Sequence, residues 1–125
     1  MKNLLILPML FFSISCFADV YTGTFQNSNR SISLKYSFDS SNQNSLKGTL
    51  EANRSGRMTS CWQGVRSIDG SKIDGVDVTL IAVPSSALEG MGCEAIQFVG
   101  KVDGNKLIGK ITFGPNVSDV VLAKE

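Results

Sequence analysis

The stretch SISLKYSF, residues 31–38, decides the fold class of this chain. Polar and apolar side chains alternate in it without a break, which places its apolar members on one face. A period of two residues is typical of a half-buried β-strand, whereas the apolar positions of a helix recur every three to four residues, roughly. The stretch therefore predicts a strand that buries one face.

The same alternation recurs along the chain and predicts eight strands in all. The other seven cover residues 20–25, 46–52, 59–65, 76–83, 95–102, 106–113 and 119–124. Turn-forming residues separate them, and DGN at residues 103–105 is the strongest hairpin signal because these residues tolerate a positive φ. A helix can start only at residues 86–89, and Gly90 and Gly92 limit it to a short helical turn.

Glycine stands between two inward-facing apolar residues in three of these segments, at Gly48, Gly100 and Gly109. A glycine inside a strand loses packing, so its repeated use indicates strands that bend or that another backbone approaches closely. Coiled strands joined by hairpins are typical of a small closed barrel. We therefore predict an all-β fold, a small antiparallel eight-stranded up-and-down β-barrel. A β-sandwich is the alternative, because its strands alternate in the same way.

Residues 1–18 have the features of a cleaved secretory signal peptide. Lys2 provides the positive start, an apolar run follows, and residues 16–18 supply small side chains at the positions that define cleavage. Cleavage would leave residues 19–125 as a single β-barrel domain, periplasmic or secreted. The alternative is a lipoprotein signal in which Cys16 is acylated. The apolar run is shorter than the roughly 20 residues of a spanning helix, so we expect no membrane span.

Two cysteines, Cys61 and Cys93, remain after removal of the signal peptide. An even pair in an oxidising compartment predicts a disulfide bond. Closing a loop of that length adds about 3–4 kcal/mol in the chain-entropy model, a large share of the stability of a domain of this size.

Charge balance and residue types exclude several classes of function. The chain has 12 basic and 11 acidic residues, and loss of Lys2 with the signal peptide leaves 11 of each. Nucleic-acid binding needs a dense basic face, which scattered arginines do not provide. Histidine is absent, which removes His-based acid–base pairs, histidine-activated nucleophiles and the usual zinc sites. We therefore expect no enzyme, no metal, no cofactor and no nucleic-acid partner.

TGTF at residues 22–25, then Asn27 and Ser31, and then LKGTLE at residues 46–51 form a pattern at the start of the domain. This pattern resembles the opening of the avidin-like proteins, barrels of the calycin type that hold biotin. In that family the residues matching Asn27 and Ser31 hydrogen-bond the ligand, and Asp119 falls where an Asp contacts it before the last strand. The resemblance implies a barrel that binds a small molecule through these three side chains.

A loop predicted after residue 53 is basic and contains glycine. Residues 55–58 and 62–64 resemble the inhibitory elements of the bacterial periplasmic inhibitors of C-type lysozyme, which are also small antiparallel barrels. The resemblance implies a protein partner, bound by a loop that enters an acidic cleft. The loop residues in question are Arg54, Ser55, Gly56 and Arg57. An ordinary solvated hairpin is the alternative interpretation of this loop.

Trp62 is the single tryptophan and stands beside Cys61. It either packs on the disulfide or faces the barrel mouth, where its ring would stack on a ligand. We therefore expect a non-enzymatic binding protein in which a small ligand occupies an open cavity. The predicted ligand-binding residues are Asn27, Ser31, Trp62 and Asp119, and the predicted cavity lining is Ile32, Leu34, Leu50, Phe98 and Ile111. The alternative is a proteinaceous inhibitor or immunity protein against a cell-envelope enzyme or toxin.

Overall fold

The computed structural model describes residues 18–27, 30–54 and 61–125, with side chains described for residues 19–26, 31–53 and 61–125. The predicted signal peptide, apart from Ala18, lies outside the described residues. The described chain folds almost entirely as strands. Its elements are β1 (Ala18–Asn27), β2 (Arg30–Asp39), β3 (Lys47–Arg54), β4 (Gly64–Ile68), β5 (Lys72–Asp74), β6 (Asp77–Val83), α2 (Ser86–Gly90), β7 (Ile96–Asp103), β8 (Lys106–Phe113) and β9 (Asn116–Lys124).

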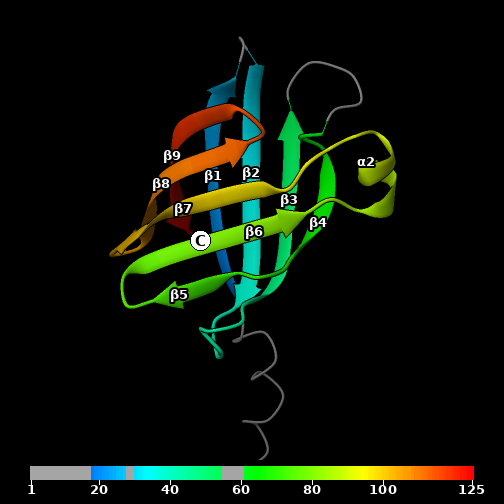
Figure 1. Ribbon diagram of the computed structural model, residues 1–125. Coiled ribbons are helices and arrows are strands. Elements are labelled where there is room, and N and C mark those ends of the chain that lie inside the picture. Colours follow the sequence, from blue (N-terminus) through cyan, green and yellow to red (C-terminus); the bar gives the residue numbers. More distant parts are fainter. Residues whose placement is uncertain (1–17, 28–29, 55–60) are drawn as a thin grey trace, which may run out of the picture.

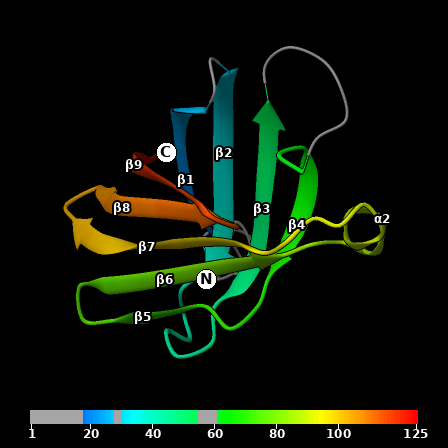
Figure 2. The ribbon, with the colours of Figure 1, turned by 45° about the horizontal axis from the view of Figure 1, so that its top comes forward.

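Eight of these strands form a closed antiparallel barrel, and β5 is an extra strand on its edge (Figure 1). Each barrel strand pairs with the next one along the chain, and the pairings of β4 with β6 and of β1 with β9 complete the circle. Figure 2 shows β1, β2 and β3 upright, with β6, β7 and β8 lying across them at a steep angle. The prediction of an up-and-down eight-stranded barrel is therefore confirmed.

The alternation that predicts β2 places its apolar side chains inside the barrel. Ile32, Leu34, Tyr36 and Phe38 are buried, while Lys35 on the opposite face is exposed. The inward side chains of the other barrel strands join them in one hydrophobic core. Burial of this shared face stabilises the closed sheet and fixes its register, because a slip of one residue would turn every apolar side chain outward.

The strand glycines lie where backbones cross closely, as predicted. Gly100 of β7 pairs with Gly109 of β8. A Cβ atom on Gly109 would lie 2.2 Å from the oxygen of Val99 and 2.5 Å from the Cα of Gly100. Gly48 is equally crowded, since its Cβ would lie 1.9 Å from the oxygen of Ser37. Only glycine allows the strands to coil this tightly.

Most strands match the prediction to within three residues at each end, and two differ more. The fourth strand begins at Gly64 rather than at residue 59: residues 59–60 lie outside the described residues, and residues 61–63 form a turn. Cys61 is held by the disulfide, and Gly64 leaves the turn with a φ of 85°, a conformation that favours glycine. The strand β5 has three residues, too few to show a period in the sequence.

The predicted hairpin turn and the predicted short helical turn are both confirmed. Gly104 has a φ of 61° in the hairpin between β7 and β8. The short helical turn is α2, which begins at Ser86, the first residue of the predicted range. Ser85 is the cap, and its hydroxyl oxygen accepts a hydrogen bond from the N–H of Leu88 at 3.3 Å. In Figure 1, α2 lies outside the barrel, beyond the ends of β6 and β7.

Candidate functional site

The interior of the barrel is packed with side chains at the positions predicted to line a cavity. Each of the five predicted lining residues is at most 1% exposed and belongs to the hydrophobic core. They are Ile32, Leu34, Leu50, Phe98 and Ile111. Packing of this kind leaves the barrel interior without an open binding space at those positions.

Arg66 is a charged residue inside the barrel, and it is only 1% exposed. Its Nη1 donates to the main-chain oxygen of Glu94 and its Nη2 to that of Cys61, both at 2.8 Å. Burial lowers the pKa of this guanidinium, and its interaction with Tyr36 opposes the shift. Arg66 therefore joins two segments of chain that lie far apart in the sequence.

Two buried polar atoms have no hydrogen-bond partner among the described residues. They are the Nε of Arg66 and the phenol oxygen of Tyr36. Burial raises the pKa of Tyr36 far above its usual range, and the charge of Arg66 opposes that shift to a smaller extent. Tyr36 and Arg66 both face Leu50 across the sheet, from β2 and β4. The two side chains form a small polar pair within an otherwise apolar core.

The predicted disulfide between Cys61 and Cys93 is present, with a Cα–Cα distance of 5.6 Å. It joins the turn before β4 to the loop between α2 and β7. The ladder between β4 and β6 has only two residue pairs, Ser67 with Val83 and Ile68 with Ala82. The disulfide and the Arg66 hydrogen bonds therefore hold together the segments next to this short ladder. A disulfide is typical of proteins in an oxidising compartment.

Among the predicted ligand-binding residues with described side chains, Asp119 is exposed and Trp62 is buried in the core. Ser31 is half-buried and pairs with Gln26 at the β1–β2 hairpin. Asp119 lies on the outer face of β9, where its carboxylate accepts a hydrogen bond from Lys110 at 2.6 Å. Asn27 ends β1, but its side chain lies outside the described residues.

Trp62 lies inside the barrel and is 6% exposed. Its ring meets Phe25 edge to face with centroids 5.3 Å apart, and meets Phe113 at 5.0 Å. Aromatic contacts of this geometry stabilise a core beyond the area that they bury. The ring thus packs within an aromatic cluster close to the disulfide in sequence.

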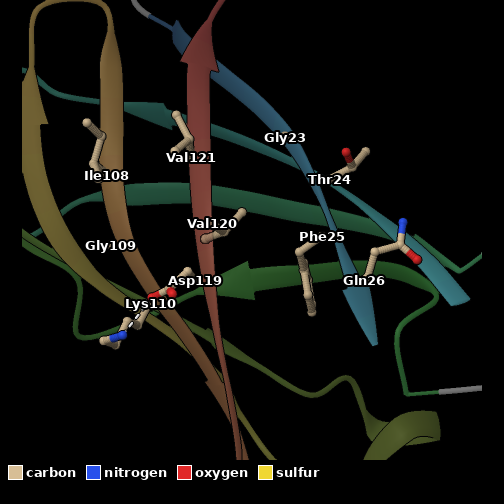
Figure 3. Close-up of a pocket in the computed structure, with 10 residues that line it drawn as sticks. All are labelled: Gly23, Thr24, Phe25, Gln26, Ile108, Gly109, Lys110, Asp119, Val120 and Val121. Carbon is tan, nitrogen blue, oxygen red and sulfur yellow. Dashed lines mark hydrogen bonds and ion pairs between the residues drawn. The ribbon is translucent and has the colours of Figure 1, made fainter. Parts of the chain in front are cut away.

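A hollow of about 660 Å³ lies on the outside of the barrel between β1 and the β8–β9 hairpin (Figure 3). Its wall on β1 is formed by residues 23–26, and its wall on β8 and β9 includes Ile108, Lys110, Asp119 and Val121. Figure 3 shows β9 and β1 close together above Val121 and separating below it. Asp119 is the predicted ligand-binding residue that lines this hollow.

A second hollow of about 500 Å³ adjoins the first. The two share Gly23 and Thr24, so β1 separates them as a common ridge. The second hollow lies over β2 and β3, and Ser33, Lys35, Glu51 and Asn53 contribute polar groups to it. The two hollows therefore make the outer surface on both sides of β1 concave.

The predicted partner-binding loop falls mainly outside the description. Ser55, Gly56 and Arg57 lie outside the described residues, and Arg54 is described only as the last residue of β3. Among residues with described side chains, no three metal-ligating groups gather into a site. No helix in the described part has the length and hydropathy to cross a bilayer.

Sequence reasoning missed the inward orientation of Arg66. Of the neighbours Val65 and Arg66, the apolar valine would be expected to face inward. However, Val65 is 56% exposed. A signal was available at the end of the strand, because Ile68 is buried and Arg66 shares its face by the period of two. Because Arg66 is charged, the sequence shows no apolar alternation at this position.

Comparison with known proteins gives no relative from which a role can be taken. No protein-family model matches the chain, and no curated protein or solved structure matches it. The site therefore has to be interpreted from its own residues.

Proposed function

We propose that the mature chain is a non-enzymatic binding protein of the periplasm or the extracellular space, which recognises a protein partner through the outer surface of its barrel. In this role it acts as an inhibitor or immunity protein against an enzyme or toxin of the cell envelope. The observation that supports this proposal is the packed interior, where the five predicted lining residues are at most 1% exposed.

A barrel that holds a small molecule inside needs an internal space of roughly 300–1,000 Å³. Here apolar side chains fill the corresponding positions, and the buried guanidinium of Arg66 already donates to two main-chain oxygens. The hollows found lie on the outside, around β1. Recognition through the outer surface accounts for both features.

Two features of the chain support this location for the partner. Residues 1–18 have the features of an export signal. The Cys61–Cys93 disulfide also fits a compartment in which thiols are oxidised. A partner in the cell envelope would meet the protein there.

The experiment that tests this function uses the purified mature protein and a panel of purified envelope enzymes. The panel contains a muramidase, an amidase and an endopeptidase that act on peptidoglycan. We expect saturable inhibition of one enzyme, with a matching complex in native mass spectrometry. The Cys61→Ala/Cys93→Ala variant, unfolded by mild denaturant, controls for non-specific effects. Full activity of every enzyme, with no complex formed, would exclude the inhibitor role within this panel.

A small ligand bound on the outside is the second candidate, favoured by the size of the two adjoining hollows. Volumes of about 660 and 500 Å³ match those of ordinary ligand sites. Native mass spectrometry of protein purified from envelope extract should then show a copurified molecule. Its loss in a Val121→Trp variant, which fills the first hollow, would place the ligand there.

A further inference from the structure

The two strands that close the barrel pair over only a small part of their length. β1 and β9 contain ten and nine residues, yet their ladder consists of two pairs, Tyr21 with Lys124 and Thr22 with Ala123. The next pair in register, Gly23 with Leu122, is not formed. Beyond this point both strands continue without pairing to each other.

The main-chain groups of β1 that point toward β9 can be assigned from the hydrogen bonds. The oxygen of Val20 accepts from the N–H of Glu125 at 2.8 Å. Main-chain groups of alternate residues in a strand point to the same side. The N–H and C=O of Thr24 and Gln26 therefore point toward β9, as those of Val20 and Thr22 do, and away from β2.

The ladder ends because the two strands cross at Gly23. A Cβ atom on Gly23 would lie 2.4 Å from the main-chain oxygen of Val121 and 2.9 Å from the Cδ2 of Leu122. After this close approach the strands separate, and the hollow of about 660 Å³ opens between them (Figure 3). We call this hollow the β1–β9 groove. Its β1 wall is a strand edge: after Thr22, no residue of β1 forms a ladder pair with β9.

We propose that the β1–β9 groove binds an extended segment of a protein partner, which adds to β1 as a further strand. The main-chain groups of Thr24 and Gln26 would form the hydrogen bonds. Strand addition to an uncovered sheet edge is a common mode of peptide recognition, in which the main chain supplies affinity and alternate side chains supply specificity. This inference rests on the proposed function and specifies how the partner is recognised.

The groove indicates the chemistry of the segment. Lys110 and Asp119 in its wall neutralise each other at 2.6 Å. Ile108 and Val121 beside them are 43% and 47% exposed. A segment without charges, with apolar side chains on alternate residues, complements such a wall. The part of β1 after Thr22 has five residues and spans about 17 Å, so the segment needs roughly five residues.

A second copy of this folded chain does not present such a segment on its surface, because its own uncovered edge, β1 after Thr22, lies within its β1–β9 groove. Among the described strands, β5 is the one that ends the sheet, and it has three residues. On its outer side, the N–H of Ile73 already donates to the oxygen of Gln43 at 2.8 Å, and Leu46 forms a bridge with Ser71. The occupant is therefore an unpaired segment of another protein.

The test uses proline at a position where only the groove-facing donor is lost. Thr24→Pro removes the N–H that points into the groove and leaves the β1–β2 hydrogen bonds intact. Thr24→Val keeps that N–H and the shape of the side chain, so it is the matched control. A displayed library of random peptides about eight residues long, enough to cover the groove, is selected on the wild-type protein. Circular dichroism verifies that each variant is folded.

We expect the selected peptides to bind Thr24→Val as they bind wild type, and to bind Thr24→Pro about tenfold more weakly. Gln26→Pro with Gln26→Thr repeats the comparison nearer the end of the strand, in case Thr24→Pro does not fold. Hydrogen–deuterium exchange of the wild-type protein gives a measurement that needs no variant. In it, the amides of Thr24 and Gln26 should exchange readily alone and become protected with peptide.

A library without binders would overturn the inference. So would peptides that bind the proline and control variants equally, or that leave both amides unprotected. These outcomes are separable from the enzyme panel. An inhibited enzyme without any peptide binder removes strand addition alone, whereas peptide binding without an inhibited enzyme leaves strand addition in place and removes the inhibitor role.

Discussion

The guanidinium of Arg66 donates from Nη2 to the main-chain oxygen of Cys61 at 2.8 Å. This bond lies beside the Cys61–Cys93 disulfide, and the second amino group holds Glu94 on the other side of it. A covalent bond and a buried cation thus fix the same two segments. They supplement a short ladder, because β4 and β6 share only two residue pairs.

Replacing Arg66 should destabilise the barrel. Arg66→Met keeps most of the volume but leaves the oxygens of Cys61 and Glu94 without their donor. We expect the free energy of unfolding to fall by about 2–4 kcal/mol, measured by urea titration. Lys101→Met, which breaks an exposed ion pair with Asp77, is the control and should change it by less than about 1 kcal/mol. Equal stability of Arg66→Met and wild type would contradict the role assigned to Arg66.

The stability of the protein should fall at alkaline pH because of Tyr36. Burial raises the pKa of Tyr36 in the folded state. Above about pH 10 the unfolded chain releases this proton and the folded chain keeps it. The contribution of the Tyr36 proton to the free energy of unfolding is therefore fully present below pH 10. It is lost as the pH rises further, by about 1.4 kcal/mol per pH unit.

Tyr36→Phe is the matched variant for this pH dependence. It removes the ionisable hydroxyl and the unpaired buried oxygen together, so its stability at neutral pH should equal or exceed that of wild type. Chemical denaturation at a series of pH values from neutral to alkaline compares the two proteins. Parallel pH profiles above pH 10 would show that Tyr36 does not cause the loss.

Gly109→Ala should destabilise the barrel, because the backbones of β7 and β8 approach closely at this residue. The new Cβ would lie 2.2 Å from the oxygen of Val99, so the strands would have to separate. We expect a loss of about 1–3 kcal/mol or more in thermal unfolding. Gly90→Ala is the control, because no atom lies within 4 Å of its Cβ position. If both variants melted together, close approach would not explain the glycine.

Removing the disulfide should cost a large part of the stability. The cysteines are 32 residues apart, and closing a loop of about this length contributes roughly 3–4 kcal/mol in the chain-entropy model. Cys61→Ala/Cys93→Ala should therefore unfold at clearly lower urea concentration. A thiol titration of the unfolded wild-type protein, with and without reductant, checks that the bond is present. Two free thiols in the unreduced material would contradict the pairing.

The basic residues of the predicted partner-binding segment, Arg54 and Arg57, should matter if the chain inhibits an enzyme with an acidic cleft. Arg54→Glu/Arg57→Glu reverses two charges, so inhibition of the responsive enzyme should weaken strongly, and more at low salt than at high salt. Lys101→Glu places one reversed charge on the outer face of β7 and should leave inhibition nearly unchanged. Undiminished inhibition by the loop variant would assign recognition to another surface, such as the β1–β9 groove.

The sequence alone determined the features that depend on local patterns. Alternation over residues 31–38 specified a half-buried strand, and the glycines at Gly100 and Gly109 indicated close strand crossings. Two cysteines that follow a predicted export signal indicated a disulfide bond between them. These patterns are readable because a period of two and a missing side chain have consequences within one or two strands.

Only the tertiary structure decided what lies inside the barrel and where its surface is hollow. Arg66 faces inward because β4 pairs in register with β3. The main-chain oxygens that accept its hydrogen bonds come from the disulfide-linked segments. The groove exists because β1 and β9, from opposite ends of the domain, cross at Gly23 and then diverge. Such contacts join residues distant in the chain, and their geometry depends on how the whole sheet coils to close, which no local stretch of sequence specifies.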